Sequence, residues 1–318
     1  MKRRILLDSN VWRYFIDANE LPSLLTATRR SRHVVVMSPA VLYEAAKTGN
    51  VAVRDKLLSA MTLPAWKRMM PEAYCEAEEI RAEVRRIRPE WLKPKPDLAW
   101  FNHVRYDWTR AKGGNWDRVK NHPELLERVE DGVTARSREQ AYLHREDSAD
   151  WSPKWRTASL MKTVGEPATP IRGWNGTPVE LWRLAALTVF SHSLQFQEHH
   201  PYLDWLGGDI ELNMMLFQSE SLAKFWLHEV ETVRMPRHWL RWAFEFLQRQ
   251  YAVSDGTPVD AQLGTYLVEV DLFLSADKTM VRIAEKCRAD APFRLAESLR
   301  VPGGDACVDA VLSHLRTP

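Results

Sequence analysis

Short apolar runs that end at a polar or acidic residue mark both ends of this 318-residue chain. Residues 5–7 form the first run, which stops at Asp8, and residues 33–37 form the second. A third run, residues 272–276, stops at Asp277. Runs of this length without polar alternation are typical of strands buried on both faces of a parallel sheet. The pattern therefore predicts an α/β unit built from the two ends of the chain.

The residues that follow these runs predict helices. Ser38 is a suitable N-cap for the helix after the second run, and Pro39 suits the first turn of that helix. The helices expected in this unit span residues 11–16, 40–47, 261–270, 278–284 and 305–315, and residues 293–301 could supply one more short strand. Each strand thus leads into a helix, and the carboxyl ends of such strands are where ligands bind in open α/β sheets.

The middle of the chain shows no strand pattern between residues 54 and 250. Residues 72–88 combine many charges with apolar residues at helical spacing, which predicts an amphipathic helix that ends at Pro89. Further helices are expected at residues 177–190, 209–217, 220–232 and 236–250, and a long loop is expected at residues 151–176. The middle is therefore expected to be mainly helical.

The expected architecture is a small parallel sheet flanked by helices, with a long helical insertion. The sheet domain is discontinuous and comprises residues 1–54 plus 250–318, roughly 120 residues in total, which is an ordinary domain length. The insertion comprises residues 55–249. Because it follows the second strand and precedes the third, it could overhang the carboxyl edge of the sheet.

Composition and charge exclude several classes of function. The formal net charge of +2 is too small to imply nucleic-acid binding by itself. The three cysteines form no C-x-x-C pair, so neither a disulfide framework nor a thiolate zinc site is supported. The first apolar run is too brief for a signal peptide, and no apolar run approaches the ~20 residues of a membrane span. We expect a cytoplasmic, reduced protein that is not bound to a membrane.

Residues 91–122 mix aromatic and basic side chains around prolines and glycines. Cations can meet the phosphates of a single-stranded nucleic acid while aromatic rings stack on its bases. The candidate phosphate contacts are Lys93, Lys95, Arg105, Arg110 and Lys112. The alternative is that the tryptophans of this segment pack in the core of the helical insertion.

A group of histidines offers a possible metal site in the insertion. His192, His199 and His200 share a helical face, which could hold a metal ion. No thiolate lies nearby and the spacing matches no known ligand pattern, so ordinary structural histidines are the simpler interpretation.

Four acidic residues occupy equivalent places in the expected α/β unit. They are Asp8, Glu44, Asp260 and Asp277. Each lies at the carboxyl end of a strand or in the first turns of the helix that follows. If the four converge, their repulsion is tolerable only with cations between them, and hard oxygen ligands favour Mg²⁺ or Mn²⁺. Such a site activates water and stabilises the attacking and leaving oxygens of a phosphodiester.

Three of these acids also have a purely structural interpretation. Asp8 can cap the helix that follows it, and Thr257 with Asp260 fits a capping box. Glu44 can be a solvated residue on the surface of its helix, as glutamates usually are. Both kinds of interpretation stay open at the level of the sequence.

In these four segments the chain resembles the PIN-domain ribonucleases. The matching motifs are residues 5–11, 36–44, 259–264 and 273–278. The resemblance implies a small parallel sheet flanked by helices and a metal-dependent endoribonuclease activity. It also implies that Asp8, Glu44, Asp260 and Asp277 are the catalytic, metal-binding acids, with Asn10 and Ser275 as polar supports. It covers only the two ends of the chain and leaves the insertion unexplained.

The resemblance also indicates which partners to expect. The implied substrate is RNA, although the same metal chemistry cuts DNA. The implied cofactor is Mg²⁺ or Mn²⁺. An inhibitory protein partner, as in a toxin–antitoxin pair, and a homo-oligomer are both compatible with this family.

Two other functions are compatible with parts of the sequence. A phosphatase of the haloacid-dehalogenase type also begins with a strand ending in aspartate, and residues 304–309 resemble its late acidic motif. That chemistry needs an acid two residues after the nucleophile, where this chain has Asn10, and we expect no good strand before Gly304. The second alternative is an inactive PIN-like scaffold that only binds nucleic acid or protein. The presence of all four acids disfavours it.

Overall fold

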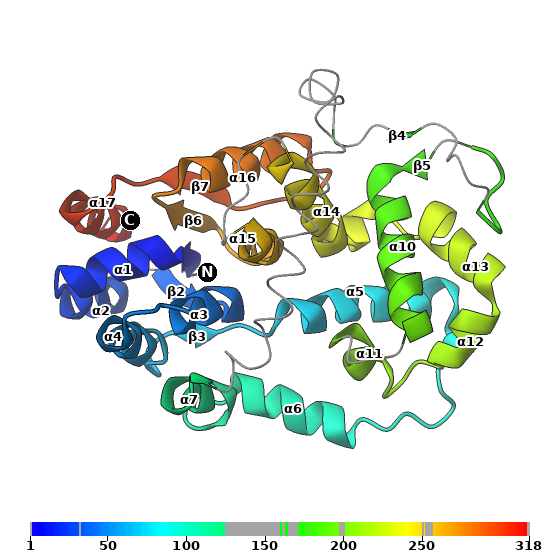
Figure 1. The fold of residues 1–318 in the computed structure, drawn as a ribbon, viewed down its shortest axis with the longest axis horizontal. Helices are drawn as coiled ribbons and strands as arrows, with labels where there is room; N and C mark the ends of the chain where they lie inside the picture. Colours follow the sequence, from blue (N-terminus) through cyan, green and yellow to red (C-terminus); the bar gives the residue numbers. More distant parts are fainter. Residues whose placement is uncertain are drawn as a thin grey trace.

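The α/β part and the helical part of the chain lie side by side along the long axis of the molecule (Figure 1). The computed structural model describes residues 2–31, 33–124, 160, 163–164, 171–177, 179–196, 201–249, 251 and 257–316. Most of the loop expected at residues 151–176 lies outside these ranges. One continuous hydrophobic core runs through both parts, so neither part has a core of its own.

Five parallel strands form the central sheet, in the order β3-β2-β1-β6-β7. The strands are β1 (Arg3–Leu7), β2 (His33–Met37), β3 (Lys67–Arg68), β6 (Leu272–Ser275) and β7 (Glu297–Arg300). β1 is central, because Leu6 pairs with Val36 of β2 on one side and with Phe273 of β6 on the other. The apolar run of β1 is fully buried, as its lack of polar alternation predicts. The predicted α/β class with a parallel sheet is confirmed.

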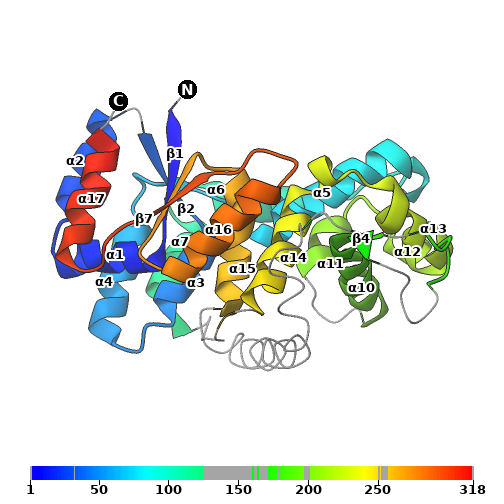
Figure 2. The ribbon, with the colours of Figure 1, turned by 90° about the horizontal axis from the view of Figure 1, so that it is seen from above.

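Helices cover both faces of this sheet (Figure 2). They are α1 (Ser9–Asp17), α2 (Leu21–Arg30), α3 (Pro39–Ala46), α4 (Val51–Met61), α15 (Thr257–Gly264), α16 (Lys278–Asp290) and α17 (Asp305–Arg316), with the 3-10 turn η4 (Thr265–Val268) after α15. α1, α2 and α17 pack together on one side, and α16 lies on the other. Ser38 caps α3 as predicted, since its hydroxyl accepts from the backbone N–H of Val41 (3.4 Å).

The helical part is built around α5, the long charged helix that the sequence predicts. Its elements are α5 (Glu72–Ile87), η1 (Pro89–Trp91), α6 (Ala99–Thr109), α7 (Gly114–Asn121), β4 (Thr163–Val164), β5 (Val179–Glu180), α10 (Leu181–Phe196), α11 (Pro201–Leu206), α12 (Leu212–Phe217), α13 (Ser219–Lys224), the π turn η2 (Phe225–Glu229), η3 (Thr232–Arg234) and α14 (Pro236–Gln248). α14 packs against α5 and also against α15 and α16, so it belongs to both parts.

Three short strands contradict the prediction that the middle of the chain contains none. β3 pairs with β2 at the edge of the sheet, and β4 pairs with β5 as a separate antiparallel ladder. Each has only two residues, and β3 consists of Lys67 and Arg68. A charged two-residue edge strand contains no apolar run, so it leaves no signal in the sequence. The sheet therefore takes in residues beyond the boundary expected at residue 54, which itself falls inside α4.

Several helix boundaries in the helical part also differ from the predictions. The helix expected from residue 177 begins at Leu181, because the two residues before it form β5. The helix expected from Asp209 begins at Leu212, and the Asp209 carboxylate forms a buried ion pair with Arg81 of α5 (2.7 Å). The helix expected at residues 220–232 divides into α13, the π turn and η3.

Buried ion pairs join α5 to the α/β part. Glu79 of α5, only 7% exposed, accepts from Arg237 of α14 (2.9 Å), and Arg237 also donates to Glu269. Burial alone would lower the pKa of Arg237, but the charges of Glu79 and Glu269 raise it above its ordinary value. Glu269 in turn pairs with Arg4 of β1 (3.3 Å). A chain of ion pairs thus runs from the central strand into the helical part.

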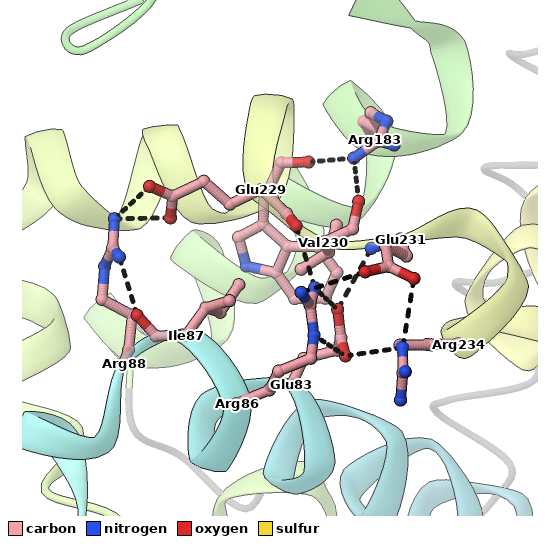
Figure 3. Close-up of polar contacts among 10 residues, drawn as sticks. Glu83, Arg86, Ile87, Arg88, Arg183, Glu229, Val230, Glu231 and Arg234 are labelled. Carbon is pink, nitrogen blue, oxygen red and sulfur yellow. Dashed lines mark hydrogen bonds and ion pairs between the residues drawn. The ribbon is translucent and has the colours of Figure 1, made fainter.

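A second polar cluster lies at the C-terminal end of α5 (Figure 3). Glu83 is fully buried, and its two carboxylate oxygens accept from Arg86 (2.9 and 2.6 Å). The backbone N–H of Glu231 also donates to Glu83 (3.1 Å), and Arg88 pairs with Glu229 (2.5 Å). These contacts fix the segment after the π turn against α5.

Replacing Arg237 with Met should lower the free energy of unfolding by about 3–5 kcal/mol, because the buried Glu79 carboxylate is left without its main partner. Urea unfolding followed by circular dichroism measures this decrease. The matched control is Arg288→Met, which breaks an exposed pair with Glu285 (3.6 Å) and should cost less than about 0.5 kcal/mol. Equal decreases in the two variants would contradict the structural role of Arg237.

Candidate active site

Asp8 lies at the carboxyl edge of the sheet, directly after β1. Its backbone N–H donates to the carbonyl of Leu274 (3.0 Å), which places Asp8 level with Ser275 of the neighbouring strand β6. The side chain is buried, with 6% exposure of the residue. Burial raises the pKa of Asp8, hydrogen bonds to the carboxylate oppose that rise, and the nearby charge of Asp277 adds to it. The first candidate acid is thus a buried carboxylate with another charge close by.

Three neighbouring residues hold the Asp8 carboxylate in place. The side-chain amide of Asn10 donates to Oδ2 (2.9 Å), and the Ser275 hydroxyl donates to the same oxygen. The backbone N–H of Ser9 donates to Oδ1 (2.7 Å). Asn10 also accepts from the backbone N–H of Ala276 (3.1 Å), so it ties the end of β6 to α1. Asn10 and Ser275, which the family resemblance implies as polar supports, both contact Asp8.

Glu44 lies on α3 and interacts with Ser9 and Asp8. The Ser9 side chain hydrogen bonds to its carboxylate, while burial and then the charge of Asp8 raise the pKa of Glu44 to about 7. The Ser9 hydroxyl also lies 3.5 Å from Oδ1 of Asp8. Ser9 therefore links two acids from different elements, a role that the sequence did not indicate. Glu44 is half-buried and so differs from an ordinary solvated glutamate.

Asp260 and Asp277 complete the group of acids. Burial raises the pKa of Asp260 on α15 to about 8, and the charges of the other three acids add to the rise. A hydrogen bond with the Gln248 side chain of α14 opposes it. Asp277 precedes α16 and is exposed, and its charge acts on the other three carboxyls. The structure therefore brings all four acids, from four separate elements, within electrostatic range of one another.

Two of the acids also cap helices. Asp8 is the N-cap of α1, as the simpler interpretation predicts. Asp277 is the N-cap of α16, and its Oδ1 accepts from the backbone N–H groups of Thr279 (2.6 Å) and Met280 (2.9 Å). No residue in the described ranges donates to Oδ2 of Asp277. Capping therefore uses one oxygen of Asp277 and leaves the second for another partner. The side chain of Thr257, which a capping box with Asp260 requires, lies outside the described part.

A cleft of about 240 Å³ opens between α1 and α3 beside these acids. It is lined by Ser9, Asn10, Arg13, Glu44, Ala45, Lys47, Thr48 and Leu57. Two neighbours of Asp8 and one of the four acids thus form part of its wall. The cleft gives a small molecule or a chain segment access to Glu44 and to the residues beside Asp8.

The four acids influence one another without forming a closed cage. Within the residues that the structure describes, no three His, Cys, Asp or Glu side chains lie close enough to hold a metal ion among them. Mg²⁺ does not need such a cage, because it usually keeps several waters and binds one or two carboxylates plus substrate phosphates. The arrangement suits a cation held partly through water.

The aromatic residues of the segment 91–122 divide into a buried and an exposed set. Trp91 and Trp116 are fully buried, so for these rings the core-packing alternative is correct. Trp100 and Tyr106 on α6 are 52% and 63% exposed. The second pair is the more open to a ligand, and Trp108 of the same segment is half-buried.

The five basic candidates of the same segment divide in a similar way. Lys93 donates to the carbonyl of Gly207 (2.6 Å), and Arg110 pairs with Asp107 (2.7 Å), so both have structural partners. Lys95, Arg105 and Lys112 are exposed and remain the better candidates for phosphate contacts. Of the three histidines considered for a metal, His192 is exposed on α10, and His199 and His200 lie outside the described residues.

The strand β7, which ends at Arg300, confirms the short strand expected within residues 293–301 and shows that the prediction of no good strand before Gly304 is wrong. A short, partly polar strand of this kind leaves a weak pattern. The phosphatase alternative nevertheless lacks its acid, because the Asn10 side chain donates an amide N–H to Asp8 and has no acidic proton for a leaving group.

Comparison of the chain with protein-family models, with curated proteins and with solved structures gave no match. Among the helices of the described part, none is both long and apolar enough to cross a bilayer. The function must therefore be argued from the geometry and chemistry of the site.

Without metal, the raised pKa values of Glu44 and Asp260 should make the protein less stable as the pH rises. In the folded protein these carboxyls, with pKa values of about 7 and about 8, keep protons that the unfolded chain has already released. The folded state therefore binds more protons, and rising pH favours unfolding until both groups are ionised.

The variant Asp260→Asn isolates this effect. Its stability relative to the unsubstituted protein should increase by about 1–3 kcal/mol between pH 5 and pH 8, because Asn carries no charge to repel its neighbours. Urea unfolding in chelator at the two pH values measures the change. A stability difference that is the same at both pH values would show that Asp260 does not sense the other acids.

Proposed function

We propose that this protein is a metal-dependent nuclease that hydrolyses phosphodiester bonds in RNA. The observation that carries the proposal is the gathering of four acids from separate elements, in which burial and then the charges of neighbouring acids raise the pKa of Glu44 to about 7 and that of Asp260 to about 8. The charge of Asp277 disfavours the charged forms of the other three acids, and the charge of Asp8 does the same at Glu44 and Asp260. Structural ion pairing does not require such a group, whereas cation-dependent hydrolysis does.

The architecture supports a PIN-like assignment for the α/β part. A parallel sheet carries the acids at its carboxyl edge, and the central strand β1 leads directly to Asp8. The motif order along the chain agrees with that family, in which the acids serve an endoribonuclease. In this proposal the helical part is an insertion into the nuclease unit.

Mg²⁺ or Mn²⁺ fits the donor set of this site. Carboxylate oxygens are hard ligands that both ions favour, and Oδ2 of Asp277 has no donor among the described residues. The residues that would hold the ion are Asp8, Glu44, Asp260 and Asp277. When bound, the ion supplies charge stabilisation for the phosphodiester and lowers the pKa of an attacking water.

The protein's own contribution is to fix the acids against their repulsion. Asn10 and Ser275 orient the Asp8 carboxylate, and Ser9 lies between Asp8 and Glu44. Such supporting contacts set the direction of a metal-binding carboxylate and tune its basicity.

A second candidate function is a PIN-like scaffold that binds nucleic acid or protein without cutting. The helix caps formed by Asp8 and Asp277 favour it, because capping alone explains why an acid stands at those two places. Capping does not explain why Glu44 lies near the other acids, and it does not explain why the pKa of Asp260 is raised. DNA as a second substrate, an inhibitory protein partner and a homo-oligomer are further proposals that follow from the family resemblance.

The purified protein should cleave single-stranded RNA in Mg²⁺ or Mn²⁺ and be inactive in excess chelator. Asp8→Asn should lower the rate by more than about 100-fold, beyond the 10–100-fold typical of a supporting residue, while Ser275→Ala should fall within that range. Gel analysis of a labelled RNA measures the rates.

The matched control for this experiment is Asp309→Asn, which changes an exposed acid on α17 and should keep full activity. Asp8→Asn purified in the same way also controls for contaminating nucleases. Cleavage that persists in chelator, or survives in Asp8→Asn, would refute the nuclease proposal. Metal-independent RNA binding without cleavage would favour the scaffold.

We also propose that Lys95, Arg105 and Lys112 contact RNA outside the site. Replacing all three with Gln should weaken binding and reduce the magnitude of the salt slope by about 0.7 for each phosphate that the protein no longer neutralises. Fluorescence anisotropy at several salt concentrations measures both quantities. An unchanged slope would show that this segment does not bind RNA, and a protein partner would become the better explanation for its exposed rings.

A further inference from the structure

We propose that Arg13 and Lys47 hold a backbone phosphate of single-stranded nucleic acid in the cleft between α1 and α3, beside the bond that is cut. This inference rests on the proposed function and adds to it the groups that bind the substrate. The cleft contains both side chains together with Ser9, Asn10 and Glu44, which contact or belong to the group of acids.

The two cations come from the two helices that line the cleft. Arg13 follows Asn10 by three positions on α1, so it lies one helical turn further along the same face. Lys47 follows Glu44 by three positions at the end of α3, and its charge lowers the pKa of Glu44. Both cations are therefore within one helical turn of a residue of the site.

The geometry of Arg13 leaves its phosphate-binding edge available. Its Nε donates to both carboxylate oxygens of Asp17 (2.9 and 2.7 Å), which fixes the plane of the guanidinium group. No acceptor for Nη1 or Nη2 is found among the described residues. These two nitrogens form part of the rigid fork that binds phosphate oxygens in pairs.

Electrostatics explains why cations are needed at this place. A phosphodiester that approaches four carboxylates meets like charge, and a metal ion neutralises only part of it. The positive charges of Arg13 and Lys47 offset the remaining repulsion at the adjacent phosphate. The hydroxyl group of Thr48 lines the same cleft and can donate to a phosphate oxygen.

The size of the cleft selects a single strand. Its volume of about 240 Å³ lies below the ~300–1,000 Å³ of ordinary ligand pockets. One nucleotide unit of a single-stranded backbone fits such a space. A duplex contains a second strand and holds its backbone in a fixed groove geometry. Ala45 and Leu57 form the apolar part of the cleft lining, against which a sugar can pack.

The test measures binding in the Asp8→Asn background, so that cleavage does not interfere. Labelled single-stranded RNA, single-stranded DNA of the same sequence and a duplex of that sequence are compared by fluorescence anisotropy across a range of salt. Adding Arg13→Gln and Lys47→Gln together should weaken single-strand binding roughly tenfold and reduce the magnitude of the salt slope by about 0.7, the value for one phosphate. The affinity of the Arg13→Lys variant should lie between those of the parent and the double variant, because lysine keeps the positive charge but lacks the planar guanidinium group.

The matched control is Lys2→Gln, which removes an exposed charge at the opposite edge of the sheet and should leave the affinity and the slope unchanged. Equal weakening for RNA and DNA supports a contact to the shared phosphate, and weakening for RNA alone supports it with an added contact to the ribose. An unchanged affinity and slope in the double variant overturns the inference, as does a duplex that binds as tightly as the single strand. Absence of cleavage by the unsubstituted protein would overturn the nuclease proposal instead, and the binding data would still decide the role of the cleft.

Discussion

The repulsion among four carboxyl groups at one edge of a parallel sheet is the constraint on which the site depends. Burial and like charge together raise the pKa of Glu44 to about 7 and that of Asp260 to about 8. Such an arrangement weakens a folded protein at neutral pH unless something compensates for the charge. Hydrogen bonds from Asn10 and Ser275 compensate in part at Asp8, and a bound cation would compensate for the rest.

The remainder of the fold holds these acids in place. Asp8 and Asp277 lie at the ends of the two central strands, and the registered pairing of β1 with β6 sets their separation. Asp260 depends on the helical part, because Gln248, its hydrogen-bond partner, lies at the C-terminal end of α14. The N-terminal end of the same helix is fixed by Arg237 to α5. The helical part therefore supports one of the four acids directly.

The sequence predicts the parts of this structure that depend on local pattern. The apolar run before Asp8, the cap and proline that begin α3, and the order of the acids could all be read from neighbouring residues. Features that depend on residues far apart in the chain could not be read from the sequence. The sequence predicts α5 as an amphipathic helix but does not show that one of its acids is inside: Glu83 is fully buried because Arg86 and a backbone N–H from a distant segment satisfy it. The two-residue edge strand β3 and the position of Ser9 between two acids likewise become visible only when the chain is folded.

The central claim is that the four acids act together as one cation site at the carboxyl edge of the sheet. The most direct measurement is an anomalous difference map from crystals of the protein soaked in Mn²⁺. The account predicts a strong peak among Asp8, Glu44, Asp260 and Asp277, and no such peak in crystals of Asp8→Asn treated in the same way. Manganese peaks confined to other parts of the surface, with these four side chains unchanged, would contradict it.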